Sequence, residues 1–189
     1  MEESAMKSLI ASFFAILVLL TPSTTTAQQK TNVETVSAEL VRVLHIRDMS
    51  KLAGFVHPTK GVRFSPYEFV ESSHRVMTAN QVRSTDNTAY VWGNYDGNGD
   101  PIRLTFDAYY RQFVYDRDYI RAPRITRNGV VGKGNTTNNI REFYPRSVWM
   151  EYHYPAPSQR NNWNSLWLVF EQLDGKWYLV GVVHGEWTI

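Results

Sequence analysis

Two pairs of histidine and glutamate stand two residues apart near the end of this 189-residue chain: Glu151 with His153, and His184 with Glu186. In a β-strand, residues two apart lie roughly 7 Å from each other on one face. A carboxylate beside an imidazole orients the ring and tunes its pKa towards neutrality, which general acid–base catalysis requires. We therefore take these four residues as candidate catalytic groups, with Tyr90 as a further proton donor. The alternative is that they are rim residues whose hydrogen bonds are satisfied within the fold.

The turn at Asp174-Gly175 decides which face of the sheet carries the second pair. A two-residue turn puts His184 on the face opposite Leu166, and a three-residue turn reverses this. The sequence leaves both arrangements open, so it does not predict whether the two pairs converge.

An acidic loop is the calcium candidate. Asp96, Asn98 and Asp100 stand at positions 1, 3 and 5 of an EF-hand-like loop, and Asp107 stands at position 12. Pro101 occupies the position where the EF-hand turn requires glycine, and position 12 is not the usual bidentate glutamate. A polar hairpin loop with glycines at positive φ explains the same residues. We expect no bound cofactor, and no metal unless this loop binds calcium.

Basic residues gather in the segment 120–146, which has six of them against one acidic residue. Its anion-binding candidates are Arg121, Arg124, Arg127 and Lys133, because the Asn and Gly residues between them can expose backbone N–H groups. The partner would be an anionic glycan, a phosphate-bearing headgroup or a peptide carboxylate. The alternative is a solvated loop. The net charge of the chain is only +2, which gives no argument for nucleic-acid binding.

Aromatic residues are concentrated in or beside the predicted strands, and their rings are able to stack on a sugar. The ligand-pocket candidates are Tyr90, Trp92, Trp149 and Trp187. The more usual role of such residues is to fill the core or a dimer face. The last strand is apolar on both faces, which predicts that both sheet faces are covered, one by helices and the other by a second subunit. A homodimer is therefore expected.

The elements that position these residues follow from periodicity and turn signals. Apolar spacing predicts a helix over 33–47, Asp48 caps a second short helix, and Thr78 begins a capping box. The stretch 65–68 has capping-box form between strand-like neighbours and stays ambiguous. Further along we predict a hairpin over 88–105, a helix after Thr105, a loop over 120–146, and three closing strands at 147–154, 165–172 and 176–188.

Two long stretches, ETVSAELVRVLHIRDMSKLAGFVHP and WNSLWLVFEQLDGKWYLVGVVHGEWTI, resemble the NTF2-like (SnoaL-like, cystatin-like) superfamily. The stretches VHPTKGVRFSPY and WGNYDGNGDPIRLTFDAYYRQFVYD are similar to an uncharacterised, secreted bacterial subgroup. The resemblance implies an α+β fold, an NTF2-like cone in which a curved antiparallel sheet wraps around N-terminal and middle helices. Members of the superfamily include isomerases, dehydratases, ligand-binding modules and dimerisation domains, so the resemblance implies no single function.

The first residues of the sequence predict an export signal. Residues 9–20 form an apolar run that is too short to span a bilayer, with Lys7 before it and small residues up to Ala27 after it. We predict a signal peptide over 1–27 and one NTF2-like domain over 28–189, periplasmic or extracellular and free of the membrane after cleavage. The chain has no cysteine, which excludes disulfides and thiolate sites.

The function predicted from these patterns is an exported, non-enzymatic ligand-binding or accessory module, because no nucleophile elbow, phosphate loop or zinc-ligand motif is present. One alternative is a small-pocket acid–base enzyme, such as an isomerase, dehydratase or hydrolase. The other is a pure homodimerisation module. A histidine and a carboxylate that converge in one pocket would favour the enzyme.

Overall fold

The computed structural model describes residues 32–132, 134, 137–157 and 162–187. The predicted signal peptide, residues 1–27, lies outside the described residues. Across the described ranges, none of the helices combines the length and apolar character needed to cross a membrane.

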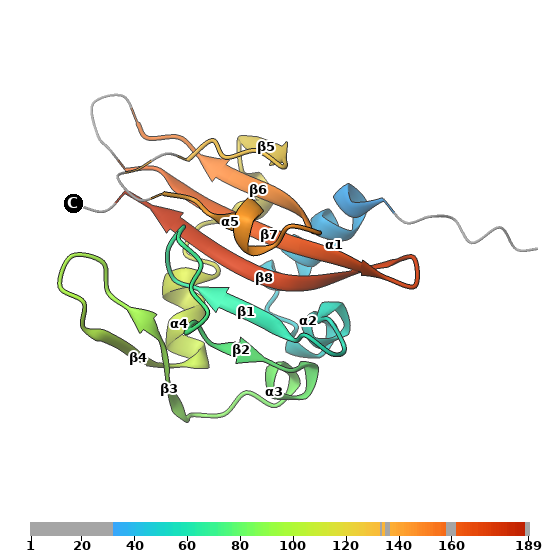
Figure 1. The fold of residues 1–189 in the computed structure, drawn as a ribbon, viewed down its shortest axis with the longest axis horizontal. Helices are drawn as coiled ribbons and strands as arrows, with labels where there is room; N and C mark the ends of the chain where they lie inside the picture. Colours follow the sequence, from blue (N-terminus) through green and yellow to red (C-terminus); the bar gives the residue numbers. More distant parts are fainter. Residues whose placement is uncertain (1–31, 133, 135–136, 158–161, 188–189) are drawn as a thin grey trace, which may run out of the picture.

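The described chain has an α+β fold built on one curved, six-stranded sheet that is mostly antiparallel (Figure 1). Across the sheet the strands are β2 (Val76–Met77), β1 (Val62–Ser65), β8 (Lys176–Glu186), β7 (Asn164–Leu173), β6 (Val148–Tyr154) and β5 (Arg124–Arg127). The pairing of β1 with β8 is parallel, and the other neighbours are antiparallel. A separate hairpin joins β3 (Ala89–Asn94) and β4 (Pro101–Thr105).

Three of the helices, those that follow Asp48, Thr78 and Thr105, begin at caps that the sequence predicts. The helices are α1 (Val33–His45), α2 (Met49–Phe55), α3 (Ala79–Arg83), α4 (Phe106–Phe113) and α5 (Ile140–Phe143), with a 3-10 turn η1 (Tyr119–Arg121). Asp48 accepts a hydrogen bond from the backbone of α2, and Thr105 accepts one from the backbone of α4. Thr78 and Gln81 form a complete capping box at α3.

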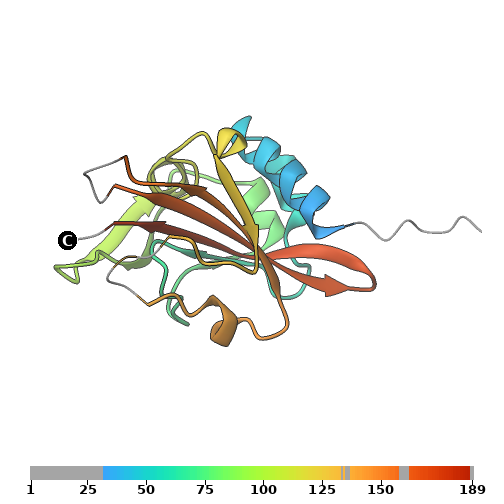
Figure 2. The same ribbon diagram turned by 90° about the horizontal axis from the view of Figure 1, so that it is seen from above.

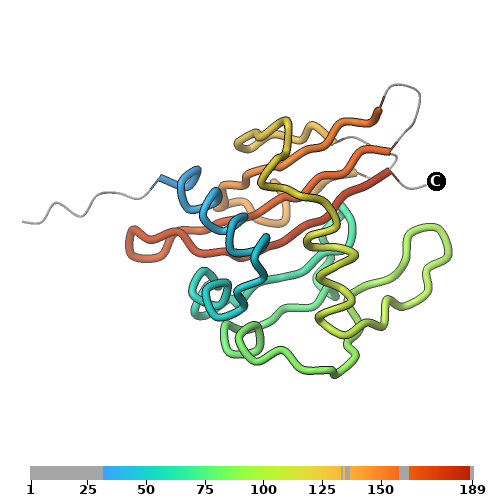
Figure 3. Tube along the Cα trace, turned by 180° about the vertical axis from the view of Figure 1, so that it is seen from behind, coloured from blue at the N-terminus to red at the C-terminus, as the bar shows by residue number. Residues whose placement is uncertain are grey.

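Both faces of the sheet are covered. Helices α1, α2 and α4 lie on one face, here called the helix face, while α5 lies on the other, the outer face (Figures 2 and 3). Leu40, Phe113 and Leu168 belong to the core of the helix face. Trp149 and Trp167 belong to a second cluster on the outer face, which segments of the same chain cover. A second subunit on this face stays a prediction.

A β-bulge sets the face of His184. The turn at 174–175 has two residues, and both have positive φ, as such hairpins require. Val180 is an extra residue in β8, and it shifts the pairing with β7 by one position. His184 therefore pairs with Leu166 and shares its face. The expectation that a two-residue turn separates these residues onto opposite faces is wrong because it assumes an unbroken ladder.

The structure resolves one ambiguous stretch and corrects one local prediction. The stretch 65–68 does not begin a helix, because Ser65 ends β1 and the Pro66 carbonyl hydrogen-bonds to the His184 ring instead. The predicted loop 120–146 contains η1, β5 and α5. Strand β5 exists because it pairs with β6 at the sheet edge, and its four residues have too little apolar alternation to predict it.

Candidate functional site

A buried carboxylate organises the outer face. Glu151 on β6 is fully buried, and its two oxygens accept four hydrogen bonds. Its donors are the backbone N–H groups of Val131 (2.7 Å) and Gly132 (2.9 Å) and the hydroxyls of Thr126 (3.2 Å) and Ser165 (2.8 Å). The four donors give both oxygens the partners that a buried polar group needs. The side chain therefore holds the loop before residue 133 onto the sheet.

His153 joins this centre through a serine. The imidazole Nδ1 lies 2.8 Å from the Ser165 hydroxyl, which itself donates to Glu151. The serine proton is thus committed to the carboxylate, so Nδ1 must donate its own proton to the serine. In the neutral ring, Nε2 is then an acceptor, and it forms no hydrogen bond with any described residue. Burial lowers the pKa of His153, and the nearby Glu151 only partly opposes this.

A second acid lies on the same face. Glu68 is buried, and desolvation raises its pKa to about 8. Its Oε1 atom has no hydrogen-bond partner among the described residues. The Glu68 side chain fits here because Gly185 has no side chain. A Cβ atom at position 185 would lie 2.9 Å from Cγ of Glu68. Gly185 pairs with Ser165, and Ser165 pairs with His153, so Glu68 lies over the same row of residues that contains the histidine.

A histidine–aspartate pair lies on the helix face. His184 is fully buried, and its Nε2 lies 3.4 Å from Asp116, an ion-pair contact rather than an aligned hydrogen bond. Asp116 also accepts hydrogen bonds from Tyr119 (2.7 Å) and Asn164 (2.9 Å). Burial opposes the charged imidazolium, but Asp116 outweighs it, so the pKa of His184 is raised. His184 lies in the core beside the Phe113 ring, whereas the Asp116 side chain is partly exposed.

The four predicted catalytic residues do not form one site. Glu151 and His153 face outward, whereas His184 faces the helices with Glu186 on the same side of β8. Neither predicted pair is joined by a direct hydrogen bond. Ser165 links Glu151 to His153, and Asp116 rather than Glu186 is the acidic partner of His184. The sequence did not indicate a role for Ser165 or Asp116. Both come from segments that only the tertiary fold brings near.

The described residues form an open cleft at the end of the sheet near the β7–β8 turn. Its volume is about 370 Å³, within the usual range for small-ligand sites. It is lined by His57, Thr59, Lys60, Arg146, Glu171, Gln172, Leu173 and Trp177. The lining comes from three separate segments, so no local motif predicts it.

The cleft presents donors and cations. His57 Nδ1 accepts from the backbone N–H groups of Thr59 (3.3 Å) and Lys60 (3.2 Å), so the neutral ring carries its proton on Nε2. Burial lowers the pKa of His57, which favours that neutral form. Lys60 pairs with Glu171. Arg146 is exposed and forms no ion pair with any described residue, so its guanidinium is available to a ligand.

The predicted aromatic candidates fall into two separate groups, and the first is Tyr90 and Trp92, whose rings are in edge-to-face contact with centroids 6.0 Å apart. Trp92 is fully buried in the helix-face core and stacks on Tyr109, with ring centroids 4.1 Å apart. Trp149 and Trp187 belong to the outer-face cluster. Tyr90 is beneath the Arg75 guanidinium, 3.7 Å from ring centroid to cation. The structure therefore does not bring these four rings together into one pocket.

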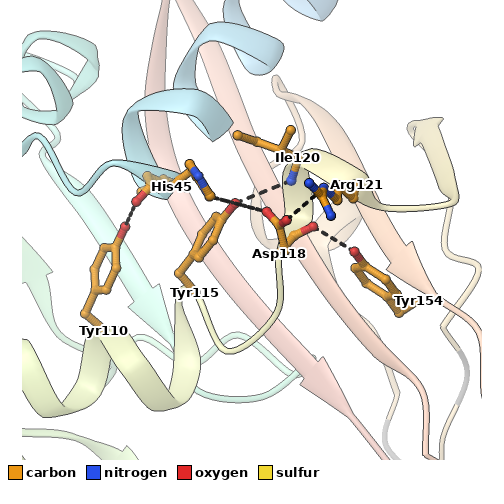
Figure 4. A network of polar contacts seen from close by, with 8 residues as sticks. His45, Tyr110, Tyr115, Asp118, Ile120, Arg121 and Tyr154 are labelled. Atoms are coloured by element: carbon orange, nitrogen blue, oxygen red, sulfur yellow. Dashed lines mark hydrogen bonds and ion pairs between the residues drawn. The ribbon is translucent and has the colours of Figure 1, made fainter.

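The predicted anion site is also dispersed. Arg121 pairs with Asp118 in a network that ties the end of α1 to the segment after α4 (Figure 4). In that network Asp118 also contacts His45 (3.3 Å), and its carbonyl accepts from Tyr154 (2.7 Å). Of the other candidates, Arg127 pairs with Glu34, Arg124 opposes His153 across β5 and β6, and Lys133 lies outside the described residues.

The acidic loop takes the form of a hairpin connection. Asn98 and Asp100 hydrogen-bond to each other, and Gly97 and Gly99 have positive φ, while Asp96 accepts from the Gly97 N–H. Asp107 lies in α4 and pairs with Arg47 and Arg111, away from the position that an EF-hand ligand would need. Across the described ranges, no three His, Asp or Glu residues cluster to hold a metal.

Comparisons of the chain with protein-family models, with curated proteins and with solved structures find no match. The function must therefore be inferred from the geometry of the chain itself.

Proposed function

We propose that the protein is an exported ligand-binding module that holds a small anionic saccharide in the cleft beside the β7–β8 turn. The observation that carries this proposal is the cleft itself, which combines the Arg146 guanidinium and the Lys60–Glu171 ion pair with polar and aromatic lining in about 370 Å³. A volume of this size holds one or two sugar rings rather than a polymer chain.

The lining matches the parts of an acidic sugar. Arg146 is the group that binds the carboxylate, because a guanidinium offers paired N–H donors to a planar anion. The Nε2–H of His57 adds a neutral donor whose orientation the loop fixes. Glu171 and Gln172 offer acceptors for ring hydroxyls, and Trp177 is half-buried against the core and borders the cleft, a setting for contact with a sugar ring.

The NTF2-like cone and the export of the protein are part of the same proposal. Packing of α1, α2 and α4 against one face of a curved sheet supports the NTF2-like cone, and the apolar segment 9–20 supports export. A homodimer remains a further proposal, and light scattering tests it.

Calorimetric titration with glucuronate tests the binding site. We expect saturable binding of glucuronate and at least tenfold weaker binding of glucose, which lacks the carboxylate. Arg146→Gln should weaken glucuronate binding about tenfold, as expected for the loss of a charged hydrogen bond. Arg121→Gln is the matched control, since that arginine is exposed elsewhere on the surface. Equal binding of the two sugars, or binding that Arg146→Gln leaves unchanged, would refute the proposal.

A further inference from the structure

The outer face carries a second centre that the cleft does not use. Its central group, His153, is fixed by the chain from Nδ1 through the Ser165 hydroxyl to the Glu151 carboxylate, with successive distances of 2.8 Å and 2.8 Å. A histidine that served only to fill the core would not need a hydrogen bond that fixes which ring nitrogen carries the proton. This arrangement leaves Nε2 with its lone pair and fixes the ring by two strands of the sheet, β6 and β7.

Donors without partners lie on the same face. The indole N–H groups of Trp163 and Trp167 are buried and have no hydrogen-bond partner among the described residues. The Trp163 ring lies beside His153, with ring centroids 6.1 Å apart. Buried donors of this kind usually have partners, and an unpaired one is costly. A bound molecule with an acceptor oxygen would satisfy such a donor next to the imidazole.

The charges around the imidazole favour a neutral base. Glu151 contacts it from its own strand, with 3.8 Å between Nδ1 and the carboxylate, and Arg124 opposes it from β5. These two opposite charges partly cancel at the ring. On the β7 side the neighbour is the uncharged Ser165, and beyond it lies Glu68, which keeps its proton at neutral pH.

We propose that the outer face is a hydrolytic site for small carboxylic esters, in which Nε2 of His153 acts as the general base. Nε2 takes a proton from water as the water oxygen bonds to the ester carbonyl carbon. The carbon–oxygen bond to the alcohol then breaks, and the imidazolium returns the proton to the leaving oxygen. The products are one carboxylic acid and one alcohol, and the histidine is restored. Ser165 and Glu151 are positioning residues, while Trp163 donates to the carbonyl oxygen.

Hydrolysis of 4-nitrophenyl acetate by the purified protein tests this site. We expect saturable release of nitrophenolate, and a loss of at least about a hundredfold in kcat/KM in His153→Gln, the lower end of what a general base contributes. His45→Gln is the control, because His45 is a solvent-exposed histidine on the other side of the molecule, and it should leave the rate unchanged. Circular dichroism confirms that each variant is folded. A rate that His153→Gln leaves unchanged would overturn the proposal.

The positioning role of Ser165 needs a readout other than rate loss. In Ser165→Ala the ring is no longer committed to one tautomer, so kcat should fall with little change in KM, and the pH at which the rate rises should move. In the unaltered protein the rate should rise with pH through an inflection below 6.5, because burial lowers the pKa of His153. A wild-type rate that follows hydroxide concentration, with no inflection, would also overturn the proposal, even if His153→Gln does not fold.

Discussion

Two glutamates show how the surroundings of a residue decide its chemistry. Glu151 and Glu68 are both buried on the outer face of the sheet. Glu151 accepts four hydrogen bonds, whereas Glu68 has an oxygen without a partner among the described residues, and desolvation raises the pKa of Glu68 to about 8. A carboxyl group whose pKa is raised by burial is typical of acid–base sites.

Glu68 should make the protein less stable as pH rises. Its pKa is about 8 in the folded protein against an ordinary value of 4.5, so the folded state binds the proton more tightly than the unfolded state. Stability from this group is fully present below pH 4.5 and is lost between there and pH 8, by up to about 5 kcal/mol. Glu68→Gln should therefore unfold at higher urea than the parent at pH 8 and at similar urea at pH 4.5. A parent protein that gains stability relative to Glu68→Gln as pH rises would contradict this.

The contact between His184 and Asp116 predicts a contribution to stability that is largest at mildly acidic pH. Because the pKa of His184 is raised, its contribution to folding stability is fully present below pH 6.5. Because the pKa of Asp116 is lowered, its contribution to folding stability is fully present above pH 3.8. Asp116→Asn should destabilise the protein by about 3 kcal/mol between these values, and by less once pH rises through the pKa of folded His184. Urea unfolding at pH 5.5 and at pH 9 measures both. Asp118→Asn, at a half-exposed position, is the control and should cost under about 1 kcal/mol.

Single residues were predictable from sequence only where spacing along one strand was enough. Glu151 and His153 were found because they alternate on β6. Ser165 was not, because its role depends on the β6–β7 register, which places it opposite His153. Asp116 and Glu68 lie outside the strands that carry their partners, and nothing local marks them as buried.

At the scale of elements, helix caps and the β-turn could be predicted from sequence, whereas the β-bulge could not. The capping side chains Asp48, Thr78 and Thr105 and the turn at 174–175 are all formed as predicted, because each depends on a few adjacent residues. The bulge at Val180 has no comparable signal, since it depends on how β7 and β8 pack on both faces. One unpredicted residue in the ladder was enough to change the face of His184.

Close packing over β8 predicts a sharp difference between two glycines. A Cβ at Gly185 would lie 2.4 Å from the Trp167 ring, whereas a Cβ at Gly54 in α2 has nothing within 4 Å. Gly185→Ala should lower the free energy of unfolding by about 1–3 kcal/mol, because the fully buried indole has little room to move. Gly54→Ala should be neutral or stabilise by up to about 1 kcal/mol through helix propensity. Chemical unfolding of both variants checks this, and equal effects would be inconsistent with the packing described.

At the scale of the whole molecule, the sheet divides the protein into two cores with different coverings. The helix-face core is covered by α1, α2 and α4, and its aromatic centre includes Trp92, Phe106 and Tyr109. The outer-face core is covered by short segments, namely α5 and the loop held by Glu151. The ester site that we propose therefore lies under the less regular covering, where local opening gives a substrate access.

This division predicts the order in which backbone amides exchange with deuterium. Strands β7 and β8 are paired on both sides and almost fully buried over residues 164–170 and 179–185, so their amides should exchange only on global unfolding. Strand β5 is a four-residue edge strand with exposed side chains at Arg124 and Ile125, and it should exchange orders of magnitude faster. The outer-face loop before residue 133 should follow β5 rather than β7, because hydrogen bonds to Glu151 and Trp149 hold it to the sheet in place of a continuous strand ladder. Hydrogen-exchange mass spectrometry resolves these segments, and Glu151→Gln should speed exchange in 126–132 while leaving 166–170 unchanged. If that variant sped exchange in β7 as much as in the loop, Glu151 would be supporting the whole sheet, and the loop would not be an independently opening cover.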